Sequence, residues 1–411
     1  MVSFESYTLA NGLRVILHLD NTTPIVAVNL LYQVGSRNEN PNRTGFAHLF
    51  EHLMFGGSKN IPKYDKVLQA VGGENNAFTS NDVTNYYISL PVQNLETAFW
   101  LESDRMNELA FSENALQIQR NVVIEEFKQS YLNQPYGDLM LLLRPLAYKV
   151  HPYQWNTIGK DIKHIEEANL NEVKDFFYKF YRPNKAILSV AGNLDIDKTK
   201  MWIDKWFGSI PSGSYNTPIL PQEPPQNERR FLEVKRNVPY NYLVMAFHSC
   251  KRKDKSFYTN DLLSDILSNG ESSRFRENLI NKKRIFSSIS AYITGNFDNG
   301  LFVIGGVPSE NISLQHAEEA IWEELNNLKT NLVSDKELEK VKNKAQTVLY
   351  FKELSVQEKA LSLCMFEAID HAERIHDEEQ HYKDVTTDDI LRVSQHIFRP
   401  TNASVLYYQA I

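Results

Sequence analysis

Short apolar runs near the start of the chain are followed by longer segments in which apolar and polar residues mix. The runs at 13–19 and 25–32 predict two β-strands, and residues 21–24 between them predict the turn of a hairpin. The pattern also predicts helices at 45–54 and 64–71, a strand at 84–90, and long helices from Leu95 and Ser112. Strands that pair locally before helices follow indicate an α+β fold.

A proline-rich segment divides the chain into two parts. Five prolines lie between Gly208 and Arg230, where they prevent a helix and discourage sheet pairing. We therefore expect a first domain at 1–209, a linker at 210–231 and a second domain at 232–411. Each part has about 200 residues, a normal domain size.

The two parts resemble each other. Residues 182–190 (RPNKAILSV) are similar to 399–407 (RPTNASVLY), and each follows an amphipathic segment. Ser334 and Glu337 form a capping-box pattern for a helix start, in a stretch that parallels the one from Ser112. The pattern predicts two homologous domains, each a mixed, mainly antiparallel sheet with helices packed on one face. A chance likeness of helix–Arg-Pro–strand segments is the alternative.

Composition narrows the class of protein. The chain has 411 residues, of which 42% are hydrophobic and 23% charged, as is typical of a soluble globular protein. A net charge of −7 disfavours nucleic acid as a partner. Cys250 and Cys364 form no metal-ligand pattern and indicate free thiols in a reducing compartment. With neither a leader pattern nor a membrane-spanning run, we expect a cytoplasmic location without a membrane partner, although a removed leader would leave the same sequence.

One segment combines two histidines and a glutamate at helical spacing. In residues 45–54, His48 and His52 are four residues apart, so a helix brings both imidazoles to one face, within reach of one metal ion. Glu51 lies beside that face, where its carboxylate can serve as the catalytic base for a water. The order His-x-x-Glu-His (HxxEH) is the inverse of the more common zinc-peptidase motif. Two surface histidines on an ordinary helix are the alternative, but the flanking residues are small or apolar, and buried polar groups need partners.

Several other stretches accompany the segment at 48–52 (HLFEH). They are 34–37 (VGSR), 72–80 (GGENNAFTS), 119–126 (QRNVVIEE), 133–137 (NQPYG), 151–153 (HPY) and 157–159 (TIG). Together these stretches resemble the pitrilysin, insulin-degrading enzyme and mitochondrial processing peptidase family of zinc peptidases. The resemblance covers nearly the whole chain. The likeness implies one zinc ion per chain and the short, two-domain architecture of the family.

The resemblance also assigns residues. The family's third zinc ligand falls on Glu126, and Gln119 replaces a second glutamate seven residues earlier, where it is expected to act behind the ligands without a charge. The family's edge strand for an extended peptide matches four substrate-binding residues. They are Asn76, Ala77, Phe78 and Thr79.

One family feature is missing. Members that work alone carry an arginine and a tyrosine, seven residues apart, in the second domain, whereas the matching positions here hold Ile280 and Ser287. In two-subunit members another chain supplies this pair. The resemblance therefore implies a heterodimer with a homologous chain without zinc, closed as a clamshell around the peptide. A homodimer in which Arg284 or Tyr292 substitutes is the alternative.

These observations predict a zinc-dependent metalloendopeptidase that hydrolyses peptides or unfolded segments. A peptidase dedicated to one precursor would use the same residues. A non-catalytic scaffold of the same fold is a further alternative, although such scaffolds have usually lost motif residues that are all present here.

Overall fold

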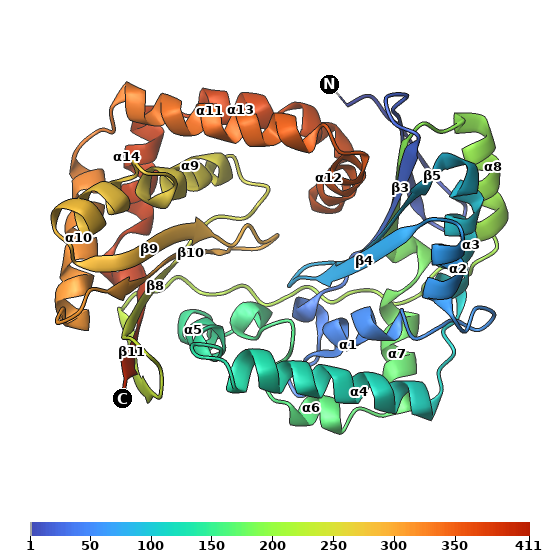
Figure 1. Ribbon diagram of the computed structural model, residues 1–411, viewed down its shortest axis with the longest axis horizontal. Helices are drawn as coiled ribbons and strands as arrows, with labels where there is room; N and C mark the ends of the chain where they lie inside the picture. Colours follow the sequence, from blue (N-terminus) through green and yellow to red (C-terminus); the bar gives the residue numbers. More distant parts are fainter. Residues whose placement is uncertain (1) are drawn as a thin grey trace. The chain divides into compact units, whose positions relative to one another are not determined.

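The computed structural model describes residues 2–411 and divides into two compact units (Figure 1). The first unit holds the chain up to Ser130, Trp155–Leu220 and Tyr350–His376. The second holds Tyr131–Gln154, Pro221–Leu349 and Asp377–Ile411. A cut at 210–231 therefore does not separate the units, because each contains a segment from the other half of the chain.

The first unit is built on a six-stranded sheet of order β1-β2-β6-β3-β5-β4. Only β2 and β6 run parallel; the other neighbours are antiparallel. The strands are β1 (Glu5–Thr8), β2 (Arg14–Leu19), β3 (Ile25–Tyr32), β4 (Glu74–Thr79), β5 (Thr84–Pro91) and β6 (Ala186–Gly192). The helices are α1 (Phe46–Leu53), α2 (Tyr64–Ala70), α3 (Leu95–Asn107), α4 (Glu113–Phe127), α6 (Lys163–Glu166), α7 (Leu170–Phe180), α8 (Ile196–Phe207) and α12 (Val356–Ile369).

The second unit has a five-stranded sheet of order β7-β11-β8-β10-β9. Its strands are β7 (Arg230–Arg236), β8 (Tyr242–His248), β9 (Phe286–Ile293), β10 (Leu301–Pro308) and β11 (Ala403–Ala410). Its helices are α5 (Leu139–Ala147), α9 (Ser256–Ser268), α10 (Leu314–Thr330), α13 (Glu378–Asp384), α14 (Thr387–Ile397) and most of α11 (Asp335–Lys352).

The two sheets repeat one topology. Strands β2, β6, β3, β5 and β4 follow the same spatial order as β7, β11, β8, β10 and β9, and the first pair of each set is parallel. The similar stretches at 182–190 and 399–407 lead into β6 and β11, which are equivalent strands in this order. The mixed, mainly antiparallel α+β fold with two related domains is confirmed.

The predicted hairpin is wrong. Strands β2 and β3 form where expected, but β6 lies between them and pairs with both. All seven residues of β6 are buried, which favours a central position over an edge. Residues 20–24 therefore link two strands that are not neighbours.

Each sheet is covered by helices on one face and by a helix from the other half of the chain on the opposite face. In β8, Leu243, Met245 and Phe247 join the core that contains α9, α10 and α14, whereas Val244 and Ala246 pack with α5. In the first unit α12 packs on β3 and β6 (Figure 1). The prediction of one helical layer holds, and the structure adds the exchanged helices α5 and α12.

Other local predictions are confirmed. Ser334 accepts a hydrogen bond from the backbone N–H of Glu337 at the start of α11, and Ser112 caps α4 in the same way. Residues 211–227 form neither helix nor strand. Cys250 and Cys364 are free thiols. Across residues 2–411, every helix is too short or too polar to cross a lipid bilayer.

Candidate metal centre

Helix α1 begins at a position that only glycine tolerates. Gly45 has φ +90°, and a Cβ there would lie 2.6 Å from the carbonyl oxygen of Ile158. The first backbone N–H groups are bound by the carboxyl group of Glu39, whose oxygens accept from Gly45 at 2.9 Å and from Ala47 at 2.8 Å. Burial raises the pKa of Glu39 to about 8, although these hydrogen bonds oppose the shift. Glu39 thus fixes the start of the helix that carries the motif.

The apolar face of α1 packs against the core, so the opposite face carries the side chains that reach the surface. Phe50 stacks on Phe176 with ring centroids 5.0 Å apart and on Tyr181 at 5.1 Å. Tyr86 donates a hydrogen bond to the carbonyl oxygen of Phe50 at 3.4 Å. Because Phe50 points inward, the helical period leaves His48, Glu51 and His52 away from the core.

Glu126 comes from the last turn of α4, whose first turn is capped by Ser112. The α-helix ends at Phe127 and continues as a π-helical segment, η3 (Lys128–Leu132). Such π-helical turns are often found at functional sites because they shift the face that side chains occupy.

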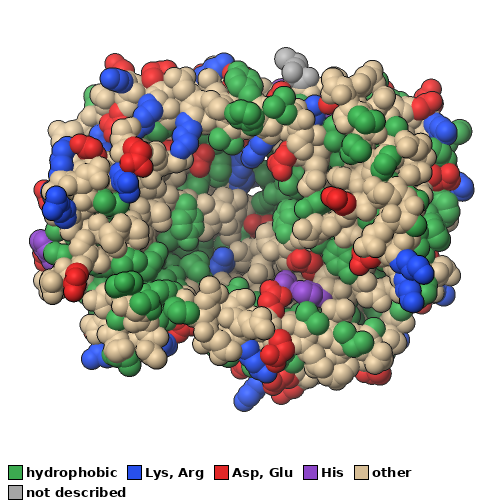
Figure 2. Space-filling view, in the orientation of Figure 1, with side chains coloured by type: hydrophobic (Ala, Val, Ile, Leu, Met, Phe, Trp, Pro, Cys, Tyr) green, Lys and Arg blue, Asp and Glu red, His purple; other side chains and the backbone are tan. Residues whose placement is uncertain are grey.

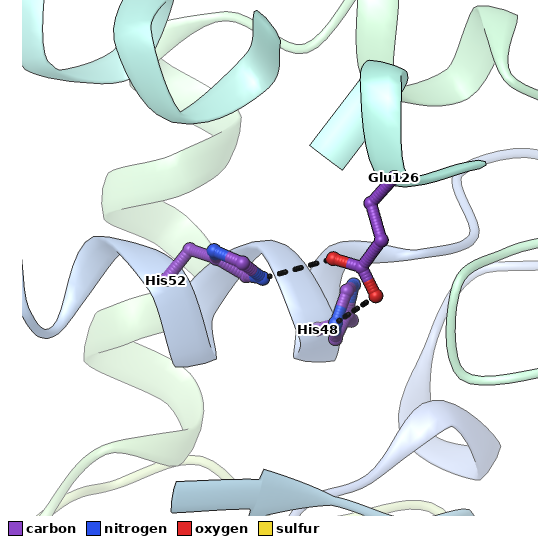
Figure 3. A group of neighbouring side chains, drawn as sticks. All are labelled: His48, His52 and Glu126. Carbon is purple, nitrogen blue, oxygen red and sulfur yellow. Dashed lines mark ion pairs between the residues drawn. The ribbon is translucent and has the colours of Figure 1, made fainter. Parts of the chain in front are cut away.

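The structure brings His48, His52 and Glu126 together. His48 Nε2 lies 3.6 Å from Glu126 Oε1, and His52 Nε2 lies 3.4 Å from Glu126 Oε2. Figure 3 shows the carboxylate pointing at both rings, which are themselves 4.8 Å apart between centroids. Ligands about 2.0–2.1 Å from one tetrahedral zinc ion would lie about 3.3–3.4 Å apart, close to the distances found.

The chemistry of this group fits a zinc ion. Within residues 2–411 it is the one group of three or more His, Cys, Asp or Glu side chains placed so that it could hold a metal ion, and its ligand atoms lie within 4.8 Å of one another. Burial lowers the pKa of His48, which favours the neutral imidazole. The interaction with His52 lowers the pKa of Glu126, which favours the carboxylate. Neutral imidazole and ionised carboxylate are the forms that bind metal.

The same group reaches solvent. The side chains of His48, His52 and Glu126 are 13%, 26% and 39% exposed. In the space-filling view, histidine and acidic side chains lie together at the surface near α1 (Figure 2). His48 Nδ1 is buried and has no hydrogen-bond partner, so that ring is not held through its second nitrogen. Three protein donors with an open side are typical of a catalytic zinc site rather than a closed structural site.

Glu51 lies next to this group and contacts β4. Thr79 Oγ1 donates a hydrogen bond of 2.6 Å to Glu51 Oε2. The four residues predicted to bind substrate lie on β4, which is the edge strand of the sheet. The Ala77 N–H is bonded to the side chain of Asn76 at 2.8 Å.

The remaining predicted positions are not among the three donors. Among the described residues, Gln119 makes no hydrogen bond with His48, His52 or Glu126; its amide nitrogen lies beside Gly56, just after α1. In the second unit, Ile280 packs against the apolar core, and Ser287 donates a hydrogen bond to the carbonyl oxygen of Val307.

Arg284 and Tyr292 also belong to the second unit. Arg284 adopts φ +55°, and Tyr292 is 45% exposed on β9. His151 lies in that unit as well, where it faces Asp298 and accepts a hydrogen bond from the backbone of Tyr153. It is not one of the three donors.

Sequence reasoning missed the roles of two residues. Glu39 precedes the helix by several residues and matches no local capping pattern, so only the fold shows that it caps α1. Thr79 was predicted as part of the substrate strand, but its hydroxyl is bonded to Glu51. Side chains alternate along the edge strand, which can indicate that Thr79 faces α1 but not which residue its hydroxyl contacts.

The chain belongs to peptidase family M16, and several of its relatives are named zinc proteases. The family model described as Insulinase (Peptidase family M16) matches residues 14–154. The model described as Peptidase M16 inactive domain matches residues 167–345.

Individual relatives extend the match over the whole chain. Zinc protease PqqE of Helicobacter pylori is 30% identical over 98% of this chain and 92% of its own length. A Bacillus subtilis protein named uncharacterized zinc protease YmxG is 29% identical over 82% of this chain and 81% of its own length. The crystal structure of a protease from Helicobacter pylori has a TM-score of 0.93 at 29% identity and covers 100% of both chains.

Two other relatives are subunits or longer proteins. Mitochondrial-processing peptidase subunit beta of Saccharomyces cerevisiae is 28% identical over 51% of this chain and 46% of its own length. The structure of pitrilysin matches 99% of this chain with a TM-score of 0.78 at 19% identity, but only 45% of pitrilysin is covered. That likeness concerns the fold.

Proposed function

We propose that this chain is a zinc-dependent endopeptidase with one zinc ion held by His48, His52 and Glu126. The observation that carries the proposal is the distance from each imidazole to the Glu126 carboxylate, 3.6 Å for His48 and 3.4 Å for His52. Both distances are close to the edge of a zinc tetrahedron, and the partly exposed side chains leave room for a water. The names of the zinc-protease relatives support the same metal. A zinc ion in this site would act as a Lewis acid and would lower the pKa of a water from 15.7 to about 7.

Glu51 is the proposed general base. Its carboxylate takes a proton from the water whose oxygen attacks the carbonyl carbon of the scissile peptide bond. When the carbon–nitrogen bond breaks, the same carboxyl group returns the proton to the leaving nitrogen. One side chain therefore serves first as base and then as acid.

Strand β4 is the proposed docking edge for the substrate. An extended peptide would add as a further strand beside Asn76, Ala77 and Phe78, and backbone pairing would accept many sequences. The Asn76 side chain would give up its bond to the Ala77 N–H, which then becomes available to the peptide. This mode suits peptides and unfolded segments because folded proteins rarely offer a free extended strand.

A homologous partner chain without zinc is part of the proposal. Ile280 and Ser287 supply neither the cation nor the phenol that would stabilise the oxyanion formed during hydrolysis. The name of the yeast relative describes a subunit, which supports a paired arrangement in this family. A heterodimer in the cytoplasm is favoured over a homodimer that uses Arg284 or Tyr292.

Two alternatives remain in the same fold. A dedicated precursor-processing peptidase would differ only in selectivity. A scaffold without activity is favoured by one observation, the match of residues 167–345 to a model described as an inactive domain. The complete set of His48, Glu51, His52 and Glu126 favours the peptidase.

Cleavage of a quenched-fluorescent peptide by the purified, zinc-loaded chain tests the proposal, with Glu51→Gln as the blank. Turnover above the blank would mean that this chain works alone. A homologous partner chain would then not be needed for cleavage. Bound zinc without turnover supports a half-enzyme, and the homologous chain should then restore cleavage. A chain that binds no zinc at neutral pH overturns the proposal.

A further inference from the structure

The hydrogen bond from Thr79 to Glu51 connects the substrate strand to the catalytic base. Its length of 2.6 Å between Oγ1 and Oε2 is the one expected when a hydroxyl donates to an ionised carboxylate. Thr79 is the last residue of β4, and its Cα partner across the sheet is Thr84 at the start of β5. The hydroxyl that touches the base is therefore fixed to the end of a paired strand.

The turn behind Thr79 holds the strand end in place. Ser80 receives hydrogen bonds on its hydroxyl oxygen from the N–H groups of Asp82 and Val83, and its own N–H donates to the carbonyl of Val83. Thr84 donates its hydroxyl to the carbonyl oxygen of Val34. With the backbone restrained on both sides, the position of the Thr79 hydroxyl is set by the sheet and not by a mobile loop.

The bond also leaves the two oxygens of Glu51 unequal. A threonine hydroxyl has one proton to donate, and it is directed to Oε2. Oε1 is left to accept a proton from a water. A glutamate has several rotatable bonds, so a side chain without this anchor would distribute over more rotamers.

We propose that Thr79 is a positioning residue that holds the Glu51 carboxylate in its reactive orientation and connects that orientation to the strand on which the peptide docks. Thr79 therefore acts through Glu51 and contributes only its backbone to the docking edge. This inference rests on the proposed function, since it assigns a role relative to the base.

Two substitutions separate the hydroxyl from the bulk of the side chain. Thr79→Val keeps the shape and removes the hydroxyl, whereas Thr79→Ser keeps the hydroxyl. We expect Thr79→Val to lower kcat by about 10- to 100-fold with little change in KM, because a small misplacement of a catalytic group costs about that much. The kcat of Thr79→Ser should stay within about threefold of the wild-type value. Both variants should bind one zinc ion.

Peptide affinity distinguishes positioning from direct substrate contact. In the Glu51→Gln background, which does not turn over, a peptide should bind with the same Kd whether or not the Thr79→Val substitution is also present. A weaker Kd for the double variant would make Thr79 a substrate contact and overturn the inference. An unchanged kcat in Thr79→Val, measured on an enzyme that cleaves, would overturn it as well.

Crystal structures of the zinc-loaded variants test the inference without any turnover. Glu51 should occupy one orientation in the wild type and in Thr79→Ser, and should leave it in Thr79→Val. An unmoved Glu51 in Thr79→Val overturns the inference, even if the chain proves inactive alone. Inactivity of the wild type would instead bear on the proposed function, so the two failures are distinguishable.

Discussion

Lys359 of α12 and Asp20, the residue after β2, form an ion pair of 2.6 Å inside the first unit. Their side chains are only 13% and 8% exposed. Asp20 also accepts two hydrogen bonds from Thr22, one from its N–H and one from its hydroxyl. The ion pair therefore connects α12, from the second half of the chain, to the end of β2 in the first half.

Replacing Lys359 by methionine tests this attachment. Thr22 would still bond to Asp20, so we expect Lys359→Met to reduce the free energy of unfolding by about 1–3 kcal/mol, less than the roughly 3–5 kcal/mol of a buried charge left alone. Urea unfolding followed by circular dichroism measures the change. Lys352→Met, at the exposed end of α11, is a matched control and should change little.

The same ion pair predicts that the stability of the protein depends on pH in the acid range. The hydrogen bond from Lys359 and those from Thr22 hold the pKa of Asp20 below its usual range. Because the folded-state pKa is lowered, the stabilisation is present above about pH 4, the ordinary aspartate value, and is lost as the pH falls through the folded-state pKa. The stability difference between wild type and Lys359→Met should therefore shrink below about pH 4. A constant difference down to about pH 2 would contradict it.

The raised pKa of Glu39 predicts the opposite trend, a loss of stability as the pH rises. Its pKa is raised to about 8, so between about pH 4.5 and 8 the folded chain retains a proton that the unfolded chain releases. The contribution of Glu39 to stability should fall as the pH rises across this window, by at most about 1.4 kcal/mol per pH unit. Unfolding of wild type and Glu39→Gln at several pH values between about 5 and 8 measures it. Parallel curves would show that Glu39 does not titrate there.

Zinc binding and peptide cleavage together should distinguish the metal ligands from the catalytic base. His52→Ala removes a donor, so we expect weaker zinc binding by about 100-fold or more and no turnover. Glu51→Gln leaves all three donors in place and should keep one zinc ion per chain while turnover falls by about 100-fold or more. Metal analysis after dialysis and peptide cleavage give both readouts. Full zinc occupancy in His52→Ala would contradict the assigned ligands.

Zinc removal should lower thermal stability. A ligand that binds only the folded state stabilises it by about 2.7 kcal/mol at 100 times its Kd. Treatment with a chelator should therefore lower the Tm of the wild type, and zinc should restore it. The Tm of His52→Ala should respond weakly to both treatments, which ties the shift to this site. An equal response in both proteins would place the stabilising metal elsewhere.

The local features of the site could be predicted from sequence because their causes are local. His48 and His52 share a face through helical spacing alone, and Phe50 shows which face is buried. The pairing of Glu126 with them needed the resemblance to a family, because spacing physics cannot choose among distant carboxylates.

Features that depend on contacts between distant segments were not predictable in this way. The insertion of β6 between β2 and β3 depends on contacts between segments far apart in the sequence, whereas the turn at 21–24 suggested only a hairpin. The packing of Ala27 against Val356 and Ala360 gives β3 a second buried face, but no pattern in α12 names its partner. Small residues in a strand indicate close packing without indicating what packs there.

The exchanged helix α12 has a consequence for synthesis of the protein. The ribosome completes β1 to β6 by Gly192, but the helix that covers Ala27 and Ala191 begins only at Val356. During that interval the nascent sheet presents one apolar face to solvent or to chaperones. The first unit is therefore the first to be synthesised, but it can complete its fold only after α12 has been made. A chain that stops before α12 should aggregate and should not form a smaller folded domain.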